Sequence, residues 1–296
     1  MGRNTEIAWT DHTFNPWIGC QRVSPGCEHC YAEQLARRSP ALVHGQSGGA
    51  VVGLPVWGPQ APRRVTSAEN WRQPLRWHKA ALRDGVRRRV FCASLCDVFE
   101  EGKGAMGGLL DEARARLWTL IEQCTGLDWL LLTKRPEAVE WSVPLRWLRG
   151  EWPAHVWIGT TVEDQRRAEE RLPHLLAIPA PVRFVSAEPL LEAADLWRWM
   201  GPKDPGIRDP RGTDGIDWLV VGGESGPGAR PFDVAWARSL RDQCAAASVP
   251  YFFKQMGARP IYTTDGGGKR VLNLRDKKGG DPAEWPEDLR VRQWPT

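Results

Sequence analysis

The strongest constraint on the fold is a series of short, continuously apolar runs spaced along the chain. Each run is five to seven residues long and ends in polar or glycine-rich sequence. Trp129–Leu132 and Trp218–Val221 show no polar alternation, which is typical of strands buried on both faces in a parallel sheet. The predicted strands are Phe14–Gly19, Arg89–Leu95, Asp128–Thr133, His155–Thr161, Val182–Ser186, Asp217–Gly222 and Val249–Lys254.

Helical patterns fall between these runs. Leu109–Cys124 carries apolar residues at helical spacing. Val162–Ile178 is a second predicted helix, which Pro173 is expected to kink or split. Val234–Ala247 and Glu28–Arg38 complete the set. Strands that alternate with helices indicate βαβ units with right-handed crossovers, and about six such units curl into a partial barrel.

We therefore predict an α/β fold, a partial (β/α)6-type barrel related to TIM barrels, with loop insertions. The barrel domain is expected over residues 1–256, with a cysteine loop near its N-terminus. A polar C-terminal extension is expected over residues 257–296. Two Gly- and Pro-rich segments, Ser39–Asn70 and Met200–Gly215, are predicted insertions. Active sites in such folds lie at the carboxyl ends of the strands.

Composition narrows the class of protein. The chain has 296 residues, of which 42% are hydrophobic and 26% are charged, as is ordinary for a globular protein. No apolar run approaches the roughly 20 residues needed to cross a bilayer. The first residues contain no signal-peptide pattern, so we expect a cytoplasmic protein without membrane association. In that reducing compartment the seven cysteines are not expected to form a disulfide framework.

The charge and aromatic content give weaker indications about partners. A net charge of +4 is too small to establish a nucleic-acid partner. The basic runs Arg63–Arg64 and Arg87–Arg89 are each best interpreted as solvated surface charge. Most of the seventeen tryptophans are expected to fill the core, and a minority to stack on bases or on a purine cofactor.

Three cysteines near the N-terminus form a compact pattern. Cys20, Cys27 and Cys30 have the spacing C-x6-C-x2-C, follow the first predicted strand and lead into a predicted helix. An odd cysteine count with three members clustered favours metal ligation. A closed zinc site needs four ligands, for which His12 or His29 is available. A four-iron cluster on three cysteines leaves one iron open. The spacing alone leaves zinc, an iron–sulfur cluster and unligated thiols as alternatives.

Polar residues directly follow the other predicted strands. Because the carboxyl ends of parallel strands meet at one edge of a sheet, these side chains are expected to converge on one pocket. The charged members are Asp97, Lys134, Glu163, Glu188, Glu224 and Lys254. The alternative is that each caps its own helix or pairs with a neighbour. Gly222 and Gly223 would permit close backbone approach to a ligand. Cys92 and Cys96 lie at the end of the second predicted strand. Their thiols are candidate hydrogen-atom donors, although we favour the interpretation that they are packing residues.

Several motifs, in order along the chain, resemble one family. They are Asn15–Cys20, Val23–Glu33, Leu132–Pro136, Val162–Asp164, Glu188–Leu191 and Gly222–Pro231. From about Trp9 to Gly257 the chain resembles the phage Gp37/Gp68 family, also known as DUF5131. That family is similar to the radical S-adenosylmethionine (SAM) superfamily. The usual superfamily spacing is C-x3-C-x2-C, so the first loop is three residues longer here.

The resemblance implies a cofactor set and a class of reaction. A [4Fe–4S] cluster is implied on Cys20, Cys27 and Cys30, with SAM as the ligand of the open iron. The implied enzyme cleaves SAM to a 5′-deoxyadenosyl radical for modification or repair of a substrate. The residues implied as catalytic are Asp97, Lys134, Glu188 and Lys254. Those implied as cofactor-binding are His29, Ser94, Asp97, Glu163, Asp164, Glu188, Gly222, Gly223, Glu224 and Ser225.

Partners follow from the same resemblance. A reductant of flavodoxin or ferredoxin type is implied. Mild basicity, the tryptophan excess and the phage association point to a nucleic acid or nucleotide as substrate. Two alternatives stand beside this hypothesis. One is a zinc-stabilised nucleic-acid-binding protein without redox chemistry. The other is a non-catalytic, cluster-binding protein that acts as the partner of another enzyme.

Overall fold

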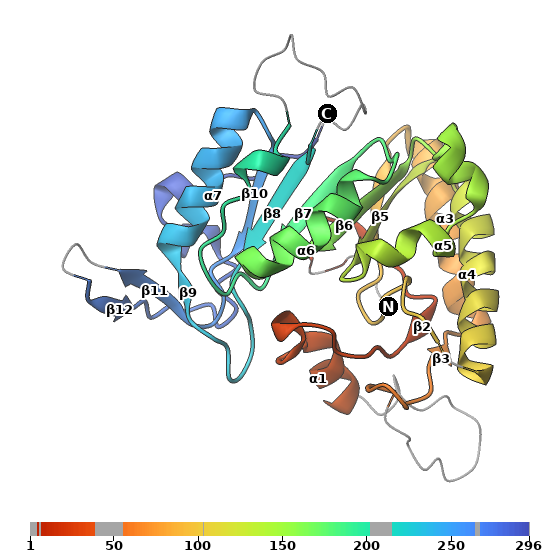
Figure 1. Cartoon of the computed structure of the whole chain (residues 1–296), viewed down its shortest axis with the longest axis horizontal. Coiled ribbons are helices and arrows are strands. Elements are labelled where there is room, and N and C mark those ends of the chain that lie inside the picture. Colours follow the sequence, from red (N-terminus) through yellow and green to blue (C-terminus); the bar gives the residue numbers. More distant parts are fainter. Residues whose placement is uncertain are drawn as a thin grey trace. The chain divides into compact units, whose positions relative to one another are not determined.

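The chain divides into two compact units, Met1–Trp157 and Ile158–Thr296 (Figure 1). The structure is a computed structural model that describes residue 5 and residues 7–38, 56–102, 104–201, 215–263 and 267–295. Most of the predicted insertion Ser39–Asn70, and nearly all of the predicted loop Met200–Gly215, lie outside the described residues.

The first unit is built on three parallel strands. They lie in the order β1 (His12–Thr13), β4 (Arg88–Cys92) and β5 (Leu127–Thr133). His12 pairs with Val90, and Cys92 pairs with Leu131. The second and third predicted strands are thus confirmed to within a few residues. Both are buried, as their continuous apolar sequence predicts.

The first predicted strand, Phe14–Gly19, is wrong. The parallel sheet uses His12–Thr13 instead, and Trp17–Ile18 (β2) pairs antiparallel with Arg64–Val65 (β3). Pro16 separates the two short strands and has no N–H for a sheet ladder, so the run cannot continue as one strand. This turn carries the chain from the sheet toward the cysteine loop.

Helices surround these strands. The α-helices are α1 (Tyr31–Arg38), α3 (Ala68–Asp84), α4 (Ala105–Gln123) and α5 (Val139–Ser142). The shorter helices are η1 (Pro25–Cys27), η2 (Pro136–Ala138) and η3 (Trp147–Glu151). The predicted helix Leu109–Cys124 corresponds to α4, and Glu28–Arg38 begins three residues later than predicted, as α1.

Helix α3 packs against β4 and β5. Ser67 caps its first turn by accepting a hydrogen bond from the Asn70 N–H, and Gly85 ends it in the left-handed region at φ 64°. The buried face consists of Trp71, Pro74, Trp77 and Ala81. This helix was not predicted, although its buried residues recur every three or four positions, as in an amphipathic helix.

Aromatic side chains fill the core of the first unit. Phe14 contacts Trp71 and Trp129 edge-to-face, with ring centroids 5.3 and 5.9 Å apart. Such pairs add to the free energy gained from burial. Eleven of the seventeen tryptophans in the chain are buried, which confirms that most of them serve packing.

The second unit repeats the strand–helix pattern. Its parallel strands lie in the order β6 (Val156–Thr161, from Ile158 within this unit), β7 (Arg183–Ala187), β8 (Trp218–Gly222) and β10 (Tyr251–Gln255). The helices are α6 (Gln165–Leu176), α7 (Val234–Ala247) and η4 (Trp197–Trp199). The four strand predictions are confirmed, and α7 has the predicted bounds. Helix α6 runs through Pro173 without being split.

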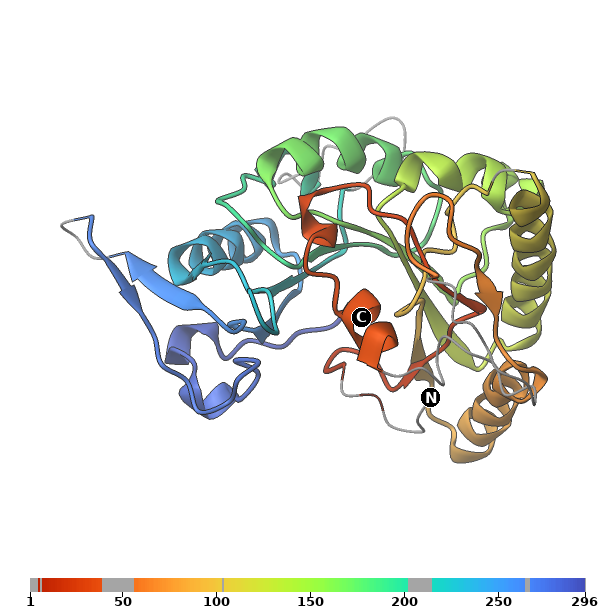
Figure 2. The ribbon, with the colours of Figure 1, turned by 90° about the horizontal axis from the view of Figure 1, so that it is seen from below.

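Residues after 256 belong to the second unit. They contribute β11 (Pro260–Thr263), β12 (Lys269–Val271), η5 (Pro282–Glu284) and η6 (Glu287–Leu289), and β11 pairs with β12 and with β9 (Phe232–Asp233). Figure 2 shows the β11–β12 hairpin projecting from this unit. Trp285 and Leu289 are buried, and the Phe253 N–H donates to the Val291 carbonyl at 2.8 Å. The boundary expected at residue 256 therefore does not coincide with the division between units.

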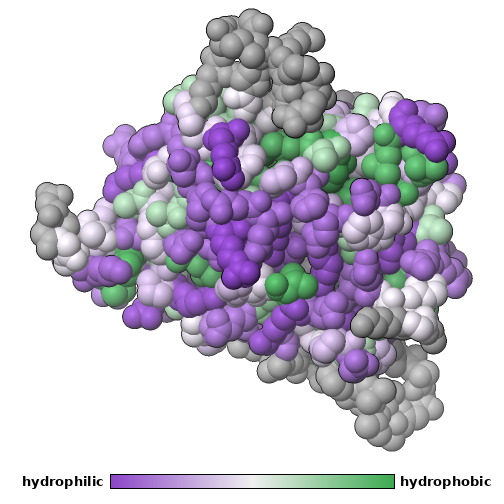
Figure 3. All heavy atoms as spheres, in the orientation of Figure 1, coloured by the Kyte–Doolittle hydropathy of each residue, from purple (hydrophilic) through white to green (hydrophobic). Residues whose placement is uncertain are grey.

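Hydrophilic residues make up most of the molecular face in Figure 3. None of the helices within the described ranges is long and apolar enough to span a bilayer. The α/β class with parallel strands is confirmed in both units, and in each the strands follow one another in sequence order.

A pair of Gly→Ala variants tests the packing of the second unit. A Cβ at Gly159 would lie 2.5 Å from the Phe184 ring, so Gly159→Ala is expected to lower the free energy of unfolding by about 1–3 kcal/mol. Gly108 is exposed on α4 with no neighbouring atom within 4 Å, so Gly108→Ala is expected to raise it by about 0.5–1 kcal/mol. Urea unfolding measures both. A neutral Gly159→Ala variant would contradict this packing.

Candidate functional site

The cysteine loop lies between β2 and α1. Cys20 follows β2, Cys27 ends η1, and Cys30 directly precedes α1. The Ser24-Pro25-Gly26 turn forms the start of η1, as Pro at the first helical position favours. All three cysteines are free thiols and partly exposed. Cys30 packs on a small apolar cluster of Ile18, Ala32, Val56 and Leu95.

Three hydrogen bonds join Tyr31 and Asn15, which flank this loop, to the residues after β4. The Tyr31 hydroxyl, one residue after Cys30, donates to the Ser94 carbonyl at 2.9 Å. The Asn15 side chain donates to the Ser94 hydroxyl at 3.0 Å and accepts from the Leu95 N–H at 2.6 Å. Ser94, a predicted cofactor-binding residue, therefore lies beside the cysteine loop. Asn15, a residue that strand-end reasoning missed, is the link between them.

Asp97 and Arg135 connect the loop to β5. The Arg135 guanidinium donates to Asp97 at 2.8 Å and to the Gln21 carbonyl at 3.1 Å, and it lies 3.9 Å from the Cys20 sulfur. The Asp97 carboxylate also accepts from the Thr133 hydroxyl at 2.8 Å and from the Lys134 N–H at 3.1 Å. Both partners of the ion pair are buried.

These contacts change the interpretation of Asp97. Its two carboxylate oxygens are engaged by protein donors, which suits a positioning residue rather than one that touches a ligand. Lys134 is partly exposed beside it. Arg135 was missed as a site residue, although its place directly after a predicted strand and after Lys134 was the signal that could have found it.

A second buried ion pair supports a segment that contacts the loop. Arg63 and Glu100 are fully buried and 2.6 Å apart. Arg63 also donates to the carbonyls of Val56 and Gly58, at 3.1 and 3.0 Å. The Gly58 N–H in turn donates to the Cys20 carbonyl at 3.0 Å. This pair therefore fixes the segment that packs on Cys20. The interpretation of Arg63 as solvated surface charge is wrong, because its side chain is fully buried against Glu100.

Gly19 allows these segments to meet. It has φ 113°, and a Cβ there would lie 2.2 Å from the Val56 carbonyl oxygen. Only glycine accepts that conformation at no steric cost. The residue directly before Cys20 is thus constrained by close backbone packing.

The thiols lie among opposing charges. Burial raises the pKa of the Cys20 thiol to about 12; Glu100 adds to the rise, and Arg135 opposes it. Near the other two cysteines, the Arg22 guanidinium binds Glu33 at 2.9 Å. The pKa of Arg22 is raised by this hydrogen bond, and the Cys27 and Cys30 thiols contribute further. Two guanidinium groups therefore accompany the three cysteines.

The donor chemistry of the loop fits a thiolate-bound cluster. Three thiols on one loop are soft ligands, and cationic neighbours favour their deprotonated form. In addition, the buried Trp17 indole N–H, three residues before Cys20, has no hydrogen-bond acceptor among the described residues. Within those residues no three His, Cys, Asp or Glu side chains are grouped closely enough to hold a metal ion. Ligation would therefore require the three sulfur atoms to move together.

The two histidines considered as further metal ligands occupy different places. His12 lies on β1 and stacks on Trp77 of α3, with ring centroids 4.3 Å apart. His29 is partly exposed in the cysteine loop, and its carbonyl accepts a hydrogen bond from Gln34 at 3.4 Å. At the end of β4, Cys92 is fully buried, as expected of a packing residue, and burial raises its pKa and that of Cys96.

In the second unit, most of the predicted acids form internal pairs. Glu163 is fully buried and binds Arg171 at 2.7 Å. Asp164 caps α6 by accepting from the Arg167 N–H at 2.7 Å, and burial raises its pKa. Glu224 is buried and bound by Arg230 at 2.5 Å. Helix capping and pairing, the alternative weighed for these residues, therefore describes all three.

Glu188 and Lys254 form a more accessible pair. Glu188 follows β7, and Lys254 lies near the end of β10, with Nζ 2.5 Å from the carboxylate. The two side chains are 16% and 19% exposed, so the pair can contact solvent. A Cβ at Gly222 would lie 3.4 Å from the Glu188 carboxyl group. Gly222 therefore lies next to this pair.

Gly223 lies close to another backbone segment of the same unit. A Cβ there would lie 2.4 Å from the Met256 carbonyl oxygen. The close backbone approach that requires glycine is thus made by the protein itself. Ser225, the last residue of the predicted set, is partly exposed in the loop that follows.

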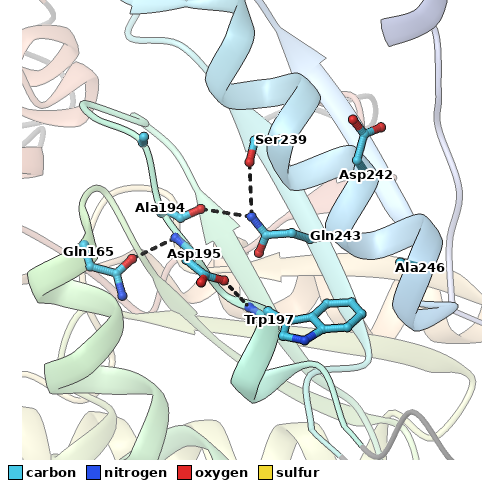
Figure 4. A pocket seen from close by; sticks show the side chains of 9 residues that line it. Gln165, Ala194, Asp195, Trp197, Ser239, Asp242, Gln243 and Ala246 are labelled. Carbon is cyan, nitrogen blue, oxygen red and sulfur yellow. Dashed lines mark hydrogen bonds between the residues drawn. The ribbon is translucent and has the colours of Figure 1, made fainter.

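An open groove of about 1010 Å³ lies elsewhere in the second unit. Figure 4 shows Gln243 reaching from α7 to the carbonyl of Ala194, with Asp195 and Trp197 on the same side of the groove. The Gln243 amide also binds the Leu196 N–H, at 2.8 Å. None of the predicted site residues lines this groove.

A comparison with family models identifies the family to which the sequence belongs. The model of a family of proteins of unknown function, DUF5131, matches residues 4–280. The chain belongs to the DUF5131 family. Neither the curated proteins nor the solved structures gave a match. The cysteine loop, the two buried ion pairs beside it and the Glu188–Lys254 pair of this DUF5131 member all lie within the matched residues.

The Asp97–Arg135 pair is expected to dominate the stability of this DUF5131 chain near the cysteine loop. Asp97→Asn leaves a buried guanidinium without its counter-ion, so the free energy of unfolding should fall by about 3 kcal/mol or more. Asp84→Asn, which alters the exposed pair with Arg83, should change it little. Urea denaturation compares the two variants. Equal effects would mean that the buried pair has no special structural role.

Proposed function

We propose that this protein is a radical SAM-type enzyme that binds a [4Fe–4S] cluster through Cys20, Cys27 and Cys30. The substrate class that we propose is a nucleic acid or nucleotide, and the reductant is a flavodoxin- or ferredoxin-like protein. The partial (β/α) barrel expected from the sequence would house this chemistry. Parallel strands that follow one another in sequence order within each unit support that architecture.

The observation that carries the proposal is the attachment of the cysteine loop to the ends of β4 and β5. The Tyr31–Ser94 hydrogen bond and the Arg135 contacts hold the loop at the carboxyl ends of two parallel strands. This is where open and closed α/β folds place their active sites. A purely structural metal site would not need to lie at the carboxyl ends of parallel strands.

The surrounding charges support an anionic metal–thiolate centre. Arg135 beside Cys20, and Arg22 near Cys27 and Cys30, lower the electrostatic cost of bringing three thiolates together. Arg135 is itself fixed by Asp97, so its charge is preorganised.

Cys20, Cys27 and Cys30 would hold the [4Fe–4S] cluster, which would leave one iron for SAM and supply the one electron for its cleavage to methionine and the 5′-deoxyadenosyl radical. The side chains that can meet a ligand are the partly exposed members of the predicted set. They are His29, Ser94, Lys134, Asp164, Glu188, Ser225 and Lys254. Asp97, Glu163 and Glu224 are buried in ion pairs with Arg135, Arg171 and Arg230, and Asp97 also accepts from the Lys134 N–H.

The metal identity is tested by anaerobic purification. We expect a brown protein with iron and sulfide each near four per chain. Cys27→Ala should lose nearly all of the iron, whereas Cys244→Ala, which removes a buried thiol on α7, should retain it. A colourless protein with stoichiometric zinc would replace this proposal by the zinc-stabilised nucleic-acid-binding alternative.

The reaction class is tested by adding SAM and dithionite to the iron-loaded protein. We expect 5′-deoxyadenosine, detected by chromatography and mass spectrometry. Lys254→Met should reduce its yield by about tenfold, because it removes a cation from the accessible pair, and Arg166→Met on the exposed face of α6 should leave it unchanged. If iron is bound but no 5′-deoxyadenosine forms, the protein is a cluster-binding partner rather than an enzyme.

A further inference from the structure

Helix α3 carries a concentrated positive charge on its solvent face. Between Ala68 and Arg89 the sequence has seven Arg or Lys residues and two carboxylates, a net charge of +5. Asp11 and Asp128, which pair with Arg89 and Arg87, reduce this to +3. The whole chain carries only +4, so most of its excess positive charge is local to this helix and its end.

The charges form a line. Arg72, Arg76, Lys79 and Arg83 recur every three or four residues and are all exposed, with side-chain exposures of 66%, 55% and 77% for the three arginines. Residues at this spacing lie on one side of a helix. At 1.5 Å per residue the line is about 16 Å long, the length of about five phosphates of one nucleic-acid strand. Figure 2 shows α3 at the outside of the first unit.

The carboxylates beside the line do not neutralise it. Glu69 pairs with Arg72 and Arg76, and Asp84 pairs with Arg83. These pairs are exposed and therefore weak, so a phosphate can compete for the same guanidinium groups. Lys79 lies between them on the exposed face.

The first turn of α3 is hydrogen-bonded to the residues beside the cysteine loop. The Asn70 side chain, in the first turn of α3, donates to the Asn15 carbonyl at 3.0 Å, and Asn15 is the residue that binds Ser94. The basic line therefore begins one turn from the hydrogen-bond network of the candidate site.

We propose that the exposed face of α3 binds the phosphate backbone of a nucleic acid. A membrane surface is a poorer occupant, because the apolar face of α3, with Trp71 and Trp77, is packed inside the unit. A protein interface would require an apolar centre, and the exposed face offers only Leu75 and Leu82 among cations. The binding is independent of sequence and governed by charge. It does not require a metal centre.

Fluorescence anisotropy with a labelled single strand and a duplex of about 20 nucleotides, over about 50–200 mM salt, tests the proposal. The variant Arg76→Gln/Lys79→Gln/Arg83→Gln removes three charges from α3. Arg166→Gln/Arg270→Gln/Lys277→Gln removes three exposed charges from the second unit as the matched control. The α3 variant should bind at least about tenfold more weakly at the lowest salt, with a log–log salt slope shallower by about 2–3 for the duplex. The control should stay within about threefold of the parent.

Circular dichroism melts establish that each variant is folded, and Lys79→Glu alone, at one exposed site, should reproduce the direction of the effect. Equal weakening by the control variant would overturn the proposal, since overall charge would then explain the binding. So would tighter binding to anionic phosphatidylserine vesicles than to either oligonucleotide. Iron content is measured on the same samples. Nucleic-acid binding through α3 by a chain without iron would sustain this proposal and remove the proposed enzymatic function.

Discussion

The buried contact between Asp97 and Arg135 holds the first unit's candidate site together. Arg135 spans from Asp97 to the Gln21 carbonyl and the Cys20 sulfur, while Asp97 also binds Thr133 and the Lys134 N–H. One pair thus joins the ends of β4 and β5 to the cysteine loop. Burying two charges costs desolvation free energy, which only near-complete hydrogen bonding offsets. The contribution of this pair is therefore mainly to specify one position for the loop, and the Arg63–Glu100 pair does the same for the segment around Gly58 that binds the Cys20 carbonyl.

The same arrangement recurs at other strand ends. Glu163 with Arg171, Glu224 with Arg230 and Glu188 with Lys254 each join an acid after a strand to a cation from the same unit. Burial distinguishes them. The first two pairs enclose carboxylates that solvent hardly reaches, whereas Glu188 and Lys254 remain partly exposed. A polar residue at a strand end is thus in the right place for chemistry, and its cationic partner decides whether it faces a ligand or holds a loop.

Much of the fold could be predicted because parallel strands buried on both faces have a distinctive apolar sequence. Six of seven strands and α4, α6 and α7 follow from such runs and from helical spacing. The first strand failed for a physical reason, because Pro16 ends it early. Helix α3 was not predicted, although its buried residues recur at helical spacing. At the candidate site, the cysteine spacing and the strand-end residues could be identified from the sequence. Arg135, Arg63 and Asn15 could not, because they act through contacts to residues distant in the sequence, and hydrophobic periodicity does not encode such contacts.

By itself, the sequence determined the α/β class and the succession of strands and helices, because these depend on the local hydrophobic pattern. It also determined that a loop with three cysteines lies near the N-terminal end of that succession, because residue type and spacing are read directly. Only the tertiary structure decided which charged residues are structural. Whether a carboxylate at a strand end is available depends on the cation that reaches it, and Arg135 meets Asp97 through folding across 38 residues of chain. It also decided that Gly223 accommodates the Met256 backbone, since a close approach between distant segments exists only once both strands are packed.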